Sequence, residues 1–281
     1  MNLKLLSSLV LTLAGASDAA RTFVPNAAVN KAISVRGGAG PLPAEATAKV
    51  ATALYGLQGT FGYLAPAKNN EAYGLKGDNV DSFIQEVASA KLLSTAITAY
   101  AVVSKGMPVL QAIGAGLVPQ AVLGVKALLN DTPSEVGVSS GGIMFDTLFT
   151  AVTTYGALTG ADYAGNAVKA YIVYTALATL QCRLAPKSAL KAWGFPEKSI
   201  ATKSFMTKIL GQQGIGWSVL AWSLTNDVDA LTAIGYASIP AFLSLMDFAT
   251  SGEMEANGGD INMLLPWGVI MAAIIGTLAI P

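Results

Sequence analysis

One phrase in this chain occurs twice, and this recurrence restricts the fold more than any other feature. The stretch LAPAKNNEAYG (64–74) recurs as LAPKSALKAWG (184–194), 120 positions later. The correspondence continues beyond the phrase at shifts of 120 to 122 positions, as in AIGAGLVP (112–119) and AIGYASIP (233–240). Chance similarity of apolar stretches would not hold its register over so long a run, so the sequence predicts a tandem duplication.

Each predicted copy contains four apolar stretches. They lie near 46–63, 84–104, 107–129 and 142–160 in a first unit at 44–163, and near 165–183, 206–226, 229–249 and 261–280 in a second unit at 164–281. Most approach the roughly 20 residues that a helix needs to cross a bilayer. They are rich in Gly, Ala, Ser and Thr, which lets helices in a membrane approach closely.

These stretches predict a fold class. Because four spans bring the chain back to its starting side, both units enter the bilayer from the same side. We expect an all-α membrane protein of two tandem four-helix transmembrane repeats, about eight spans, related by a parallel pseudo-two-fold axis. In the repeated phrase, Pro66 and Pro186 should each stop a helix, ahead of an aromatic residue and a glycine turn.

Composition supports a membrane protein and argues against catalysis. Of the 281 residues, 53% are hydrophobic and only 12% are charged, whereas charged residues make up roughly a quarter of a soluble domain. There are 17 basic and 17 acidic residues, so no net charge favours a nucleic-acid partner. The chain has no histidine and one cysteine, Cys182. A Ser-His-Asp hydrolase is therefore excluded, and we expect no enzyme, cofactor or metal site.

The amino-terminal residues have the features of a targeting segment. In MNLKLLSSLVLTLAGASDAA (1–20), a lysine precedes an apolar stretch and a small-residue end. This arrangement is typical of a secretory signal peptide, here 1–19 with cleavage after Ala19, while an uncleaved signal anchor is the alternative. The following residues, 20–43, contain Arg21, Lys31 and Arg36 but no acidic residue, which predicts a basic leader or linker.

Two short stretches within this leader are RTFVP (21–25) and SVRGGAGPL (34–42). They resemble the leader-to-mature junctions of membrane proteins in algae with complex plastids. The resemblance covers about 40 residues and implies delivery to a plastid membrane. The signal peptide alone also fits an endomembrane or cell-surface destination, so the sequence leaves the plastid and these destinations as alternatives.

Three residues within the predicted spans are candidates for a transport site. Asp146 lies four residues into the fourth stretch, and an ionisable residue in a span is a functional candidate by default. It is expected either to sit at the membrane interface or to couple transport to a proton or cation. Pro119 and Pro240 should bend the third and seventh helices, which either marks a binding site or serves packing.

Charged residues at corresponding positions have opposite signs. Glu86 corresponds to Lys208, and Lys126 corresponds to Asp247. Near a pseudo-two-fold axis, corresponding residues face each other, so we hypothesise that at least one of these pairs forms an ion pair between the units. The alternative is that all four side chains extend independently to the lipid headgroups.

Two functions fit these patterns. The first is a small-solute carrier or permease with a site between the repeats, which predicts a polar cavity near mid-membrane, lined by Asp146 or by glutamines such as Gln120, Gln212 and Gln213. The alternative is a non-catalytic membrane subunit or organiser of a larger complex, which predicts a tightly packed, dry interior. Lipid is the expected partner in both cases, and other membrane subunits are expected in the second.

Overall fold

The computed structural model describes residues 43–75 and 82–280, and every regular element in these ranges is a helix. The predicted signal peptide (1–19) and nearly all of the predicted leader (20–43) lie outside them. The long helices are α3 (Ala44–Leu64), α5 (Ser82–Val103), α6 (Val109–Leu129), α8 (Ser140–Thr159), α9 (Ala164–Leu184), α11 (Glu197–Thr225), α12 (Ala230–Ser251) and α14 (Leu265–Leu278). Shorter helices connect them: α4 (Pro66–Ala72), α7 (Thr132–Val136), α10 (Pro186–Ala192), α13 (Glu253–Ala256) and the 3-10 helix η3 (Ile261–Met263).

Each predicted apolar stretch is helical, but not all are equally apolar. In the described part of the chain, 4 helical segments are long and apolar enough to cross a membrane, namely Ser82–Val103, Val109–Leu129, Ala230–Ser251 and Ile261–Leu278. The other long helices carry more hydroxyl, amide or charged side chains, such as Lys169 and Arg183 in α9. The protein is therefore all-helical in these ranges, with four candidate membrane-spanning helices.

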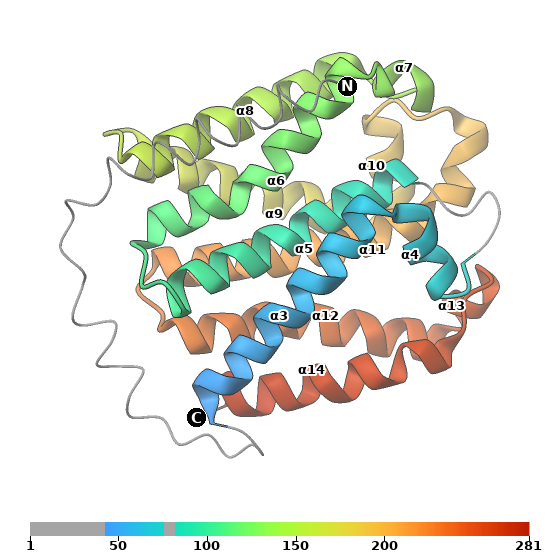
Figure 1. Cartoon of the computed structure of the whole chain (residues 1–281). Coiled ribbons are helices and arrows are strands. Elements are labelled where there is room, and N and C mark those ends of the chain that lie inside the picture. Colours follow the sequence, from blue (N-terminus) through green and yellow to red (C-terminus); the bar gives the residue numbers. More distant parts are fainter. Residues whose placement is uncertain (1–42, 76–81, 281) are drawn as a thin grey trace.

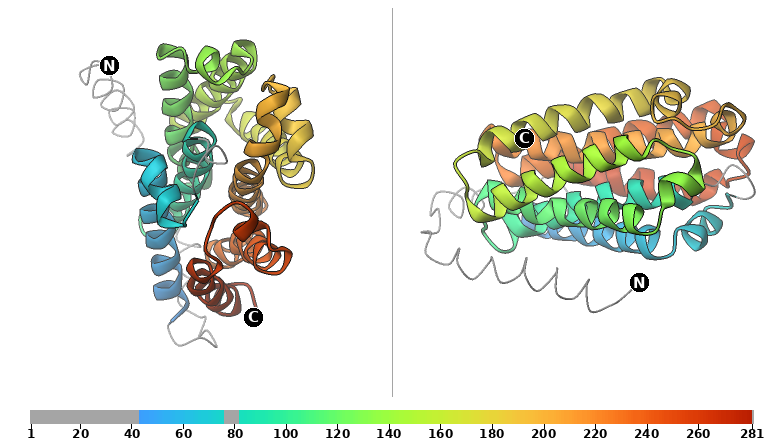
Figure 2. Two further views of the ribbon diagram at one scale, coloured as in Figure 1. Left: turned by 90° about the vertical axis from the view of Figure 1, so that its right-hand side faces the viewer. Right: turned by 90° about the horizontal axis from the view of Figure 1, so that it is seen from above.

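The long helices lie side by side along a common axis (Figure 1). α3 and α9 run in the same direction, from the left of the figure to the right, and α5 and α11 both return from right to left. The short helices α4, α7, α10 and α13 gather at the right-hand end. Figure 2 shows in its left view that the blue-to-green helices lie mostly on one side and the yellow-to-red helices on the other.

Helix contacts form two rings that share one edge. α5 and α11 pack against each other at the centre. One ring continues from α5 through α6, α8 and α9 back to α11, and the other continues from α11 through α12, α14 and α3 back to α5. Each ring therefore combines three long helices from one half of the chain with two from the other.

The repeated phrase forms a short helix and a glycine turn at the end of each ring. Pro66 and Pro186 begin α4 and α10 directly after α3 and α9 end, and the following glycines, Gly74 and Gly194, have φ of 77° and 86°. These positive φ values favour glycine, as the predicted turn requires. The structure adds a contact that the pattern does not reveal. The Ser139 N–H donates to the Trp193 carbonyl at 2.9 Å, and the Asp260 N–H donates to the Tyr73 carbonyl at 3.1 Å. Each phrase is thereby joined to the segment before the last long helix of the other half.

Large apolar side chains are exposed on the outer faces of several helices. Examples are Leu57 on α3, Leu148 on α8, Leu177 on α9 and Val269 on α14. So much exposed apolar surface is unusual for a water-soluble monomer. It is the surface that lipid tails solvate, in agreement with membrane embedding.

Candidate functional site

Each ring of helices surrounds a pocket. The ring of α5, α6, α8, α9 and α11 encloses a pocket of about 300 Å³, which we call the charged pocket because Lys91 and Asp146 line it. The ring of α3, α5, α11, α12 and α14 encloses a pocket of about 130 Å³. We call this one the amide pocket. Its amide side chains are Gln58, Asn69, Gln85, Gln212 and Gln213.

The two pockets are lined by residues at corresponding sequence positions. Residues 120 to 122 positions apart recur in the two linings, including Tyr55 and Thr175, Gln58 and Ala178, Tyr73 and Trp193, Leu75 and Phe195, Lys91 and Gln213, Gln120 and Ala241, and Ala127 and Phe248. The backbone positions are thus shared, while the polar side chains differ. A charge in one pocket is replaced by an amide in the other.

Lys91 is the centre of a hydrogen-bonded cluster in the charged pocket. It lies near the middle of α5 and is buried. Its Nζ donates to Gln120 Oε1 from α6 and lies 3.5 Å from the hydroxyl oxygen of Tyr171 from α9. Tyr171 in turn donates to Gln120 Oε1 at 3.0 Å and accepts a bond from Thr150 Oγ1 at 2.9 Å. All of these partners are uncharged.

Aromatic rings complete the surroundings of this ammonium. The Nζ of Lys91 lies 5.5 Å from the ring centroid of Tyr171 and 5.9 Å from that of Trp217, within the range of cation–π attraction. No carboxylate of residues 43–75 or 82–280 forms an ion pair with Lys91. Asp146 lines the same pocket from α8. The two charges thus share a pocket without contact.

The charged pocket extends from mid-helix to one end of the bundle. Its lining runs from Lys91 to Val138, Ser139 and Trp193, beside the short helices α7 and α10. Ser139 and Gly142 are exposed at this end. A small molecule can therefore approach the buried ammonium from the end where the connecting segments lie.

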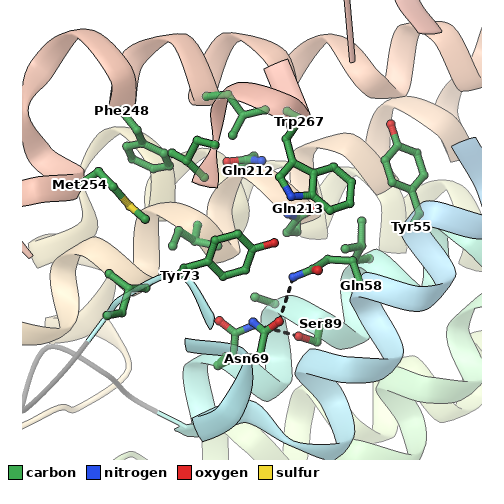
Figure 3. A pocket seen from close by; sticks show the side chains of 18 of the residues that line it. Tyr55, Gln58, Asn69, Tyr73, Ser89, Gln212, Gln213, Phe248, Met254 and Trp267 are labelled. Carbon is green, nitrogen blue, oxygen red and sulfur yellow. Dashed lines mark hydrogen bonds between the residues drawn. The ribbon is translucent and has the colours of Figure 1, made fainter. Parts of the chain in front are cut away.

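The amide pocket has polar but uncharged walls among the described residues. Figure 3 shows the Tyr73 hydroxyl directed toward the side of the pocket where Trp267 and Gln58 lie. Gln58 Nε2 donates to Asn69 Oδ1 at 2.9 Å. Burial raises the pKa of the Tyr73 hydroxyl above its ordinary value of 10.0, so this group stays neutral at physiological pH.

The structure brings some of the predicted site residues to the pockets. Asp146 lines the charged pocket. Pro119 and Pro240 lie inside α6 and α12 as predicted, each directly before a lining residue, Gln120 and Ala241. A role for any of these residues in transport stays a prediction.

The predicted ion pairs between the halves are replaced by pairs within each half. Glu86 contacts Lys126 at 2.7 Å, so neither residue pairs with its predicted partner. The cause is the orientation of the two central helices. Glu86 on α5 faces Lys126 on α6, and Lys208 on α11 faces Glu253 on α13. The pairs in the second half are Lys208 with Glu253 at 2.5 Å, and Arg183 with Asp247.

Reversing Glu86 to lysine is expected to lower the free energy of unfolding by about 1 kcal/mol, because the side chain is only 18% exposed and would face Lys126. Adding Lys126→Glu should restore most of the loss. The matched control is Glu45→Lys in the exposed pair with Lys49, which should change stability little. Thermal unfolding in detergent micelles measures all three, and a double variant no more stable than Glu86→Lys would contradict the pairing.

Lys91 is the functional candidate that sequence reasoning missed. A lysine in the middle of an apolar span is itself a strong signal, because a charge at that depth is costly. The correspondence between the units singles out Glu86, whose counterpart Lys208 has the opposite charge. It does not single out Lys91, because its counterpart Gln213 is uncharged. Tyr171 and Thr150 gave no signal, because only the folded rings bring them to Lys91.

The described residues contain no group of His, Cys, Asp or Glu that could hold a metal ion. The single cysteine, Cys182, is buried and lines the charged pocket. Comparisons with known protein families, with curated proteins and with solved structures find no match to this chain, so its function has to be inferred from the geometry of its own residues.

Proposed function

We propose that this protein is a membrane carrier for a small solute, built from two tandem four-helix units with about eight spans. The proposal includes the parallel pseudo-two-fold relation predicted from the sequence. Three observations support it. The order α3 to α8 recurs as α9 to α14, the two rings have corresponding members, and the two hydrogen bonds of the repeated phrase are equivalent.

Buried Lys91 beside a pocket of about 300 Å³ is the observation that carries the proposal. A charge in the middle of a membrane helix is expensive, and such residues usually mark substrate or ion pathways. A scaffold subunit has no need of such a charge and would be more stable with an apolar side chain there. The charged pocket favours a carrier over the alternative of a non-catalytic subunit, whose interior should be dry.

The amino-terminal leader supports delivery to a membrane by the secretory route. We infer this from the signal peptide predicted at 1–19, with plastid and endomembrane as the two destinations that residues 20–43 allow. Imaging of the full chain with a carboxyl-terminal tag separates these two destinations.

Uptake into proteoliposomes tests the carrier function. The purified full chain is reconstituted and offered labelled amino acids, sugars, carboxylates and amines in separate assays. We expect uptake of at least one class, and Lys91→Gln should reduce it at least about tenfold, because a charged hydrogen bond contributes about 1.5–3 kcal/mol. Glutamine is the residue that the chain itself carries at the corresponding position, 213.

The matched control is Lys105→Gln, which removes an exposed lysine in the turn after the same helix and should leave uptake unchanged. Absence of uptake for every class, or equal uptake by wild type and Lys91→Gln, would contradict the proposal. It would then favour the non-catalytic subunit.

A further inference from the structure

The charged pocket contains one positive and one negative side chain that do not touch. Lys91 lies on α5 and Asp146 on α8, and both line the pocket. Among the described residues, no ion pair joins the two side chains. Neither charge therefore has a partner of opposite sign in the pocket, while Asp146 is half-buried and interacts with the Tyr174 hydroxyl.

The hydrogen bonds of Lys91 leave one donor available. An ammonium group has three N–H donors. One is directed to Gln120 and another to Tyr171, and no further acceptor is bound among the described residues. Gln120 is itself held in place, because its Nε2 donates to Ser94 Oγ at 2.7 Å. The cluster therefore fixes the ammonium and leaves one N–H for a ligand.

The remaining walls of the charged pocket are largely apolar and aromatic. They include Phe83, Val87, Leu123, Phe145, Tyr174 and Phe195. A volume of about 300 Å³ is at the lower end of small-molecule sites, which suits a compact ligand with an apolar part.

We propose that the charged pocket binds a small zwitterion of the amino-acid type with an apolar side chain. Its carboxylate accepts from Lys91, its ammonium pairs with Asp146, and its apolar part packs against the aromatic walls. This inference rests on the proposed carrier function and names its substrate class. A simple anion leaves Asp146 unpaired, a simple cation leaves Lys91 unpaired, and a neutral solute leaves both unpaired.

The amide pocket serves as an internal reference. At the positions that correspond to Lys91 and Asp146, the second half carries Gln213 and Pro266. Since neither side chain is charged, the amide pocket lacks the charge pattern that a zwitterion needs. The substitution Gln213→Ala should therefore leave zwitterion binding unchanged.

Binding of three matched probes tests the inference on the purified full chain in detergent. The probes are labelled leucine, 4-methylpentanoate, which lacks the ammonium group, and 3-methylbutylamine, which lacks the carboxylate. We expect each single-charge probe to bind at least about tenfold more weakly than leucine, because it leaves buried Lys91 or half-buried Asp146 without an ionic partner. Asp146→Asn should bring leucine and 4-methylpentanoate to equal affinity, and Lys91→Gln should abolish binding of both.

The outcomes separate this inference from the carrier function. Failure of leucine to bind, equal binding of a single-charge probe in wild type, or unchanged selectivity in Asp146→Asn overturns the inference. Uptake of only another solute class into proteoliposomes keeps the carrier function and overturns the zwitterion. Zwitterion binding without uptake supports the inference and overturns the carrier. The unfolding temperature of each variant confirms that it is folded before its affinity is compared.

Discussion

Gly211→Ala is expected to lower the free energy of unfolding by about 3 kcal/mol, the upper end of the usual cost of adding atoms to a packed core. A Cβ at Gly211 on α11 would lie 2.6 Å from the Arg183 backbone nitrogen and 2.7 Å from the Thr179 carbonyl oxygen. Both atoms belong to the backbone of α9, so no side-chain rotation relieves the contact. The whole helix would have to move.

The control for this substitution is Gly276→Ala in α14. A Cβ at Gly276 meets nothing within 4 Å, and alanine is a better helix former than glycine by about 1 kcal/mol. Gly276→Ala should therefore be neutral or stabilising. Equilibrium unfolding in mild detergent micelles compares the two, and equal effects would show that α9 and α11 do not pack as closely as in this structure.

The α9–α11 contact also matters for the charged pocket. Thr179, whose carbonyl meets Gly211, is one of the residues that line it. A displaced α9 would move Tyr171 as well, because Tyr171 lies on the same helix. Gly211→Ala is thus expected to weaken solute binding together with stability, whereas Gly276→Ala should leave both intact.

The positions of the helices were largely predictable from the sequence. The stretch predicted near 107–129 is α6 (Val109–Leu129), which begins directly after Pro108. The stretch predicted near 206–226 covers most of α11 but misses its first part, because the helix begins at Glu197. An apolar stretch indicates only the part of a helix that contacts lipid or core. The first part of α11 is polar, with Lys198 and Lys203, and was therefore missed.

The candidate site was predictable only in part. Asp146 and Gln120 stood out because polar groups within spans are costly. The pairing of Glu86 was predicted wrongly, because corresponding positions in a repeat do not reveal which face of each helix meets the other. The cluster of Lys91, Gln120 and Tyr171 combines α5, α6 and α9. Their assembly depends on how the two halves close into rings, which no local pattern contains.

Lys91→Met is expected to raise the free energy of unfolding by about 2 kcal/mol while abolishing solute binding. Lys91 forms no ion pair among the described residues, so its replacement by an apolar residue of similar volume removes a desolvation penalty of several kcal/mol. Methionine leaves the former partners of Lys91 paired, because Tyr171 still donates to Gln120 at 3.0 Å and Thr150 still donates to Tyr171 at 2.9 Å. The substitution therefore removes the desolvation cost of the ammonium and leaves the hydrogen bonds among Gln120, Tyr171 and Thr150 in place.

The sign of this change distinguishes a functional lysine from a structural one. Gln120→Leu provides the opposite control, since it deprives the Lys91 ammonium of its main acceptor and should destabilise the protein by about 3 kcal/mol. Thermal and denaturant unfolding in the same micelles measure both variants. If Lys91→Met destabilised the protein as Gln120→Leu does, the lysine would be a structural element and the carrier would lose its main support. A more stable but inactive Lys91→Met is the result expected of a residue whose charge is retained for binding a solute at the expense of stability.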